Sequence, residues 1–68
     1  MEGLNKIKGY RIMVNMTMED MANAIGISLR SYIRKENKDN GQFTLSELIS
    51  IKNVLATKGL GVTLDDLS

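Results

Sequence analysis

The chain lacks the residues on which many small proteins depend for stability or chemistry. Its 68 residues include no cysteine, no histidine and no proline. Without cysteine there are no disulfide bridges, and without cysteine and histidine the usual zinc sites are excluded. No apolar run approaches the ~20 residues of a transmembrane helix, and no signal-peptide pattern opens the chain. We therefore expect one small cytoplasmic domain, residues 1–68, with no metal, no cofactor and no membrane partner.

The net charge is also small, but the charged residues are unevenly distributed. The formal net charge of +1 is too small to indicate a nucleic-acid partner. Residues 1–38 hold seven Lys and Arg residues against four acids, whereas residues 39–68 hold two bases against four acids. The first part therefore carries a charge of +3 and the second −2, which predicts a molecule with a mildly basic end.

An enzymatic site is not indicated. The acid pairs Glu19-Asp20 and Asp65-Asp66 stand at expected helix starts, where the helix dipole favours negative charge, so no reaction is needed to explain them. Gly59-Leu60-Gly61 is not a phosphate loop, because no Lys-Ser or Lys-Thr follows it. We expect no catalytic residues and no small-molecule substrate.

The most informative stretch is residues 17–37, which predicts a helix, a tight turn and a second helix. Thr17 is suited to cap the first helix. The apolar face of that helix follows at i, i+3, i+4 and i+7 spacing: Met18, Met21, Ala22 and Ile25. Gly26 then stands where a chain leaving a helix often turns left-handed, and Ser28 is suited to cap the second helix. The small side chains of Ala22 and Gly26 would let the two helices cross closely.

A further helix is expected before this pair, from Leu4 to about Asn15, which is a fair left-handed stop. Its inner stripe includes Arg11, and a buried charge needs a partner. Glu36 is equally out of place, because the dipole disfavours an acid near the end of a helix. Both placements are explained if the two charges meet, and the alternative is two independent surface charges.

Two more helices are expected after the pair. Thr44 and Glu47 form a capping box that opens the first of them, and Gly59 ends it. This helix should be the most buried, because its apolar face is broad: Leu45, Leu48, Ile49, Ile51, Val54 and Leu55. Thr63 is suited to cap a last short turn, residues 64–67. The expected fold class is therefore all-α, with five short helices and no strand.

These residues together resemble the Xre/Cro-type helix-turn-helix proteins, the lambda-repressor-like DNA-binding domains of phage and bacterial regulators. The resemblance runs from about Leu4 to Leu67. It rests on Ala22, Gly26-Ile27-Ser28, Glu36-Asn37, Phe43-Thr44-Leu45-Ser46-Glu47-Leu48 and Leu60-Gly61-Val62-Thr63-Leu64-Asp65-Asp66-Leu67. It implies a lambda-repressor-like helix-turn-helix bundle whose third helix enters the major groove of double-stranded DNA. Several phage repressors also have an Arg–Glu pair at the positions that match Arg11 and Glu36.

The candidate reading face lies on the third helix, opposite Tyr32, which we expect to point into the core. Helical spacing puts four residues on that face: Leu29, Arg30, Ile33 and Arg34. The arginine fork matches guanine O6 and N7, whereas leucine and isoleucine can touch a thymine methyl. The other interpretation of this face is a solvated basic helix with two stray aliphatic residues.

Phosphate contacts are expected on the flanks of that helix, from Ser28, Ser31, Lys35 and Lys38. An ordinary surface position is an equal alternative for the two lysines. Met18 is added to the DNA-binding set because it occupies the position at which many family members carry a phosphate-contacting glutamine.

The function that the resemblance implies is a sequence-specific transcriptional regulator, a short Cro-like phage or prophage repressor. A homodimer on a two-fold operator is expected, paired through carboxy-terminal residues that exceed the obvious need of a small core: Phe43, Leu60, Leu64 and Leu67. Closure of the monomer core is an equal alternative for each of these four residues. The alternative function is an antitoxin or anti-regulator that binds a protein partner, for which a cluster of flexible methionines would suit an adaptable surface: Met13, Met16, Met18 and Met21.

Overall fold

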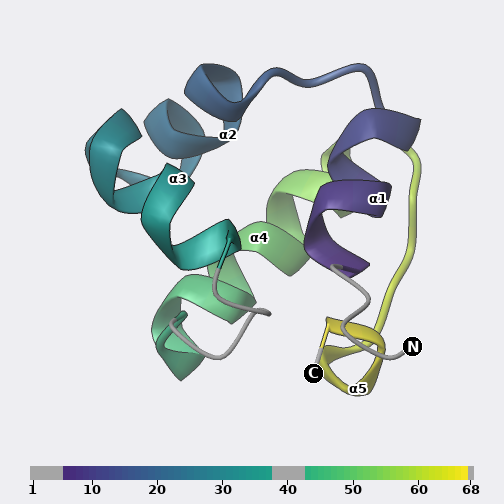
Figure 1. Ribbon diagram of the computed structural model, residues 1–68. Helices are drawn as coiled ribbons and strands as arrows, with labels where there is room; N and C mark the ends of the chain where they lie inside the picture. The colour runs from purple at the N-terminus through teal and green to yellow at the C-terminus, as the bar shows by residue number, and fades with distance from the viewer. Residues whose placement is uncertain (1–5, 38–42, 68) are drawn as a thin grey trace.

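The computed structural model describes residues 6–37 and 43–67, which form five α-helices and no strand (Figure 1). The helices are α1 (Lys6–Met13), α2 (Met18–Ile25), α3 (Leu29–Glu36), α4 (Leu45–Thr57) and α5 (Leu64–Leu67). The all-α fold of five short helices is thereby confirmed. The expected start of the first helix at Leu4, and most of the loop before Phe43, lie outside the described residues.

The helices are arranged around α4. Figure 1 shows α2 and α3 together on one side, α4 through the middle, and α1 and α5 on the other side. The principal contacts join α2 to both α3 and α4, and join α5 to both α4 and α1. Because α3 packs chiefly on α2, its far side is left at the surface of the bundle.

The boundaries of α2 and α3 follow from side chains that satisfy the free groups at helix ends. Thr17 and Asp20 form a complete capping box: each side chain accepts a 3.0 Å hydrogen bond from the backbone N–H of the other residue. Gly26 ends α2 in the left-handed conformation, at φ +81°. The Ser28 hydroxyl then accepts from the backbone N–H of Ser31 at 3.1 Å and starts α3. The turn between the two helices is thus fixed by local chemistry.

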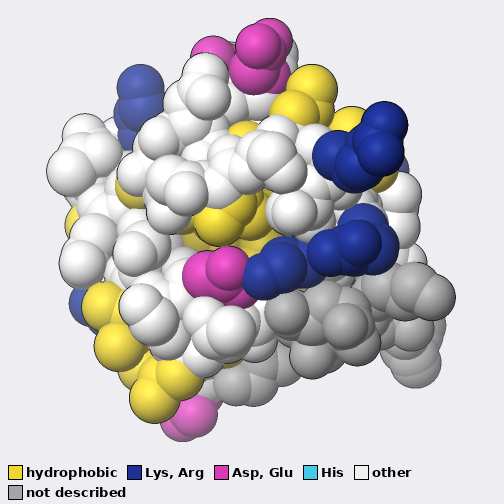
Figure 2. All heavy atoms as spheres, turned by 90° about the vertical axis from the view of Figure 1, so that its left-hand side faces the viewer, with side chains coloured by type: hydrophobic (Ala, Val, Ile, Leu, Met, Phe, Trp, Pro, Cys, Tyr) yellow, Lys and Arg dark blue, Asp and Glu magenta, His cyan; other side chains and the backbone are white. Residues whose placement is uncertain are grey.

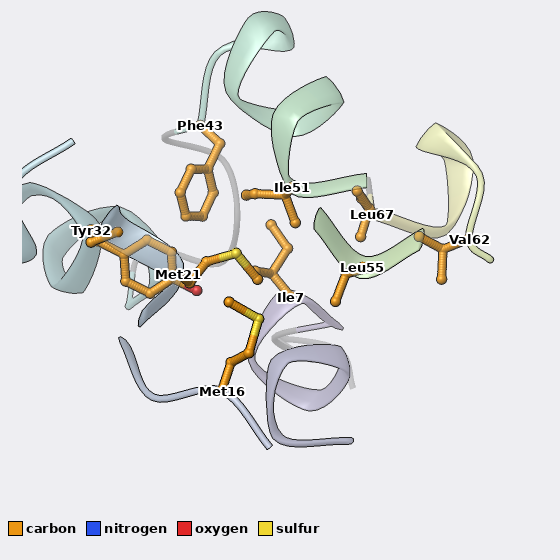
Figure 3. Close-up of a cluster of buried hydrophobic side chains, with 10 residues drawn as sticks. Ile7, Met16, Met21, Tyr32, Phe43, Ile51, Leu55, Val62 and Leu67 are labelled. Atoms are coloured by element: carbon orange, nitrogen blue, oxygen red, sulfur yellow. The ribbon is translucent and has the colours of Figure 1, made fainter. Parts of the chain in front are cut away.

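The core is built from side chains of all five helices and their links (Figure 3). Its buried hydrophobic members are Ile7, Met16, Met21, Ala22, Tyr32, Phe43, Ile51, Leu55, Val62 and Leu67. The rings of Tyr32 and Phe43 meet at a centroid distance of 5.6 Å and an angle of 53°, a tilted arrangement that aromatic pairs favour. Phe43 and Leu67 therefore close the monomer core, which is one of the two alternatives that the sequence left open for them.

The expectation for α4 was wrong at two positions. Ile51 and Leu55 are fully buried, but Leu45 is 64% exposed and Ile49 is 42% exposed. At about 100° per residue, Leu45 and Ile49 lie roughly 80–160° around the helix from Ile51 and Leu55. The core covers only one stripe of this helix, so its broad apolar face is not buried as a whole.

Candidate nucleic-acid interface

The inner side of α3 is fixed in the core by two residues one turn apart. Tyr32 and Glu36 both have no exposed surface. The Tyr32 ring points into the cluster that contains Met21 and Phe43 (Figure 3), and its hydroxyl donates a hydrogen bond to the Glu36 carboxylate. The expected inward position of Tyr32 is confirmed. Its hydroxyl contact was not foreseen, although the i, i+4 spacing of Tyr32 and Glu36 places them on one face.

The Glu36 carboxylate also joins α3 to α1. Arg11 donates to it from Nε at 3.0 Å and from Nη2 at 3.2 Å, and donates from Nη1 to the Met16 carbonyl at 2.9 Å. Arg11 is only 7% exposed, so the expected pairing of Arg11 with Glu36 is confirmed as a buried, two-pronged ion pair. Burial and the contact with Glu36 raise the pKa of Tyr32 above its ordinary value, which keeps its hydroxyl a donor. Helix α3 is therefore tied to α1 and to the α1–α2 link.

The outer side of α3 presents two kinds of side chain to solvent. Arg30 and Arg34 are exposed, and so are Leu29 (39%) and Ile33 (37%). Within residues 6–37 and 43–67 neither arginine forms an ion pair or a side-chain hydrogen bond. Figure 2, which views the molecule from the side of α2 and α3, shows Lys and Arg side chains gathered along one part of this face beside hydrophobic side chains. The structure thus brings together, at one exposed surface, the four residues expected to read bases.

The residues expected to contact phosphates are placed less uniformly. Ser28 is exposed and Ser31 is half-buried beside it at the start of α3. Met18 begins α2 and packs partly buried against the core. Lys38 lies outside the described residues. Of the described residues in this set, Ser28 and Ser31 therefore border the exposed face with polar groups that a phosphate can approach.

Lys35 has an internal partner that the sequence did not reveal. Its Nζ lies 2.8 Å and 2.7 Å from the two carboxylate oxygens of Glu47 in α4. Burial acts to raise the pKa of Glu47, but the bonds from Lys35 and from the Thr44 backbone outweigh it and hold that pKa below its usual value. The carboxylate is thus ionised at neutral pH, and the Lys35 ammonium group forms an ion pair with it, which links α3 to α4.

Other features of the described residues bear on metal binding, membrane insertion and ligand binding. The described residues contain no group of three or more acids that would hold a metal ion. None of the helices in that part of the chain is long and apolar enough to cross a membrane. One open depression of about 550 Å³ lies between α2 and the end of α4, near Asn23, Val54 and Thr57, and none of its lining residues belongs to α3.

Comparison with known proteins gives no family assignment: no protein-family model, no curated protein and no solved structure matches this chain. The interpretation of the site therefore depends on its own residues and their geometry.

Proposed function

We propose that this protein is a sequence-specific DNA-binding transcriptional regulator, a short Cro-like phage or prophage repressor that reads the major groove with α3. The observation that carries the proposal is the outer face of α3. It presents Arg30 and Arg34, exposed and without an ion pair among the described residues, on a helix whose inner side is fixed by Tyr32 and Glu36.

The dimensions of α3 suit the groove. A helix with its side chains is about 10–12 Å across and the major groove is about 12 Å wide. The eight residues of α3 span about 12 Å along its axis, which is the height of three to four base pairs. Each guanidinium can donate two parallel hydrogen bonds to the O6 and N7 of one guanine. We expect Ser28 and Ser31, at the start of the helix, to contact the phosphate backbone.

A single domain of this size makes few base contacts, so we propose that two copies bind a two-fold operator with half-sites about 34 Å apart. Of the carboxy-terminal residues considered for pairing, Phe43 and Leu67 are committed to the core. Leu60 and Leu64 are half-buried and remain the candidates for a weak contact that is completed on DNA.

Binding to a protein partner is the second candidate function. Ile12 is 55% exposed and Met13 is 65% exposed at the end of α1. These two apolar side chains belong to a different helix from the arginine face, and an antitoxin or anti-regulator would use such a surface for another protein.

The test is selection of bound sequences from random duplex DNA, followed by titration of the enriched sequence. Arg30→Ala and Arg34→Ala should each weaken specific binding by about 1–3 kcal/mol and relax the preference at one base position. Lys58→Ala is the matched control, because it removes one exposed positive charge from the end of α4. Circular dichroism checks the fold of each variant. Failure to enrich any sequence, or unchanged affinity in both arginine variants, would refute the proposal.

A further inference from the structure

The outer face of α3 consists of two parallel rows of different chemistry. Arg30 and Arg34 are four residues apart and form a basic row, and Leu29 and Ile33 are four apart and form an apolar row. At about 100° per residue the two rows lie about 100° apart around the helix. Both rows are exposed, with Leu29 at 39% and Ile33 at 37%. A concave surface that encloses this side of the helix, as the major groove does, therefore meets both the arginines and the two aliphatic side chains.

The charges beside the apolar row indicate what covers it. The two arginines have no acidic partner within the described residues. An apolar protein surface packed on Leu29 and Ile33 would desolvate Arg30 and Arg34 without compensating them, which is costly. A duplex offers what both rows need, because its phosphates and guanine edges take the arginines and its major groove also displays apolar groups.

We propose that Leu29 and Ile33 recognise the C5 methyl groups of thymines that lie next to the guanines bound by Arg30 and Arg34. This inference rests on the proposed function and adds which bases the half-site contains. The thymine methyl is the apolar group that base pairs present in the major groove. Residues four apart on a helix are separated by ~6 Å along its axis, close to two base-pair steps of ~3.4 Å. Each row thus spans two to three base pairs, and the half-site combines guanines with neighbouring thymines.

The experiment removes one methyl group at a time from the DNA. In the enriched sequence each thymine is replaced by deoxyuridine, which lacks the methyl and keeps the same hydrogen-bonding edge. At a contacted thymine we expect the affinity to fall about three- to fourfold, which corresponds to the ~0.8 kcal/mol of one buried methyl-sized group. In Leu29→Ala or Ile33→Ala that replacement should have little further effect. Arg30→Ala is the control, because it should relax a guanine preference and retain the methyl effect.

The possible results separate this inference from the function on which it rests. If deoxyuridine leaves the affinity unchanged at every position while the guanine preference persists, methyl recognition is refuted and DNA binding is not. A loss that persists in both Leu29→Ala and Ile33→Ala also overturns it, because the methyl is then read elsewhere. If no sequence is enriched at all, the proposed function itself fails. Leu29 and Ile33 are both exposed, so their alanine variants should keep the fold. Circular dichroism checks this.

Discussion

The buried pair of Arg11 and Glu36 makes a sharp prediction about stability. Glu36 is fully buried and receives two hydrogen bonds from Arg11 and one from Tyr32. Arg11→Met removes the cation that donates two hydrogen bonds to this buried carboxylate, and such a loss costs about 3–5 kcal/mol. A domain of this length is stable by roughly 3–10 kcal/mol. The substitution should therefore remove a large share of the free energy of unfolding.

The companion variants distinguish a true interaction from two separate effects. Glu36→Gln keeps a carbonyl acceptor for Arg11 but removes the opposite charge, so we expect a smaller cost of about 1–3 kcal/mol. The double variant removes both charges and leaves neither of them unpaired. Its cost should therefore be smaller than the sum of the two single costs, with a coupling energy of about 1–3 kcal/mol.

Urea unfolding, monitored by far-ultraviolet circular dichroism, measures the free energy of unfolding of all four proteins in this cycle: the unchanged protein, the two single variants and the double variant. With a urea dependence of about 1 kcal/mol per molar for a small domain, a 3 kcal/mol loss shifts the midpoint by about 3 M. Arg30→Met is the matched control, because the same change at an exposed arginine should stay within about 0.5 kcal/mol. Arg11→Lys gives a milder variant, since lysine keeps the charge and lacks the two-donor fork. Additivity within about 0.5 kcal/mol would refute the reasoning.

Three further predictions test the proposed binding face, the turn after α2 and the interior of α1. Lys35→Gln should leave the salt dependence of DNA binding unchanged, because its Nζ is held by Glu47; a slope of log K against log salt reduced by about 0.9 would show instead a phosphate contact. Gly26→Ala should destabilise by about 1–2 kcal/mol, because φ is +81° and a Cβ there meets no atom within 4 Å, so the whole cost is backbone strain. Gly9→Ala, in the exposed middle of α1 with the same open space, should stabilise by up to about 1 kcal/mol; thermal unfolding of both variants checks the opposite signs.

Features that depend on neighbouring residues were predictable from the sequence. The caps at Thr17 and Ser28 and the left-handed turns at Asn15 and Gly26 each involve groups within four positions along the chain. Hydrogen bonds over such distances are set by residue type and spacing alone.

The long-range Arg11–Glu36 pair was also predictable, although 25 residues separate its members. Each charge lies at a position that is unfavourable for a charge without a partner. A contact between the two charges explains both positions at once.

The remaining contacts depend on how two helices cross, which residue patterns do not specify. The Lys35–Glu47 pair forms because the end of α3 comes beside the start of α4. The exposure of Leu45 and Ile49 reflects which stripe of α4 the other helices cover. Both facts follow from helix orientation. A periodic apolar pattern indicates that a helix has a buried face, but it says less about how wide that face is.

The eight residues of α3 both fix the helix in the core and, in the proposed function, provide the surface that reads bases. Tyr32 and Glu36 hold the inner side, and the intervening positions Arg30 and Arg34 project from the opposite side with the same spacing. Because the two sets alternate along one rigid helix, a rotation of α3 that loosens the inner pair would also move the arginines away from the bases that we propose they contact. Under the proposed function, the buried charges near α1 therefore affect sequence recognition through the orientation of the helix, without touching DNA themselves.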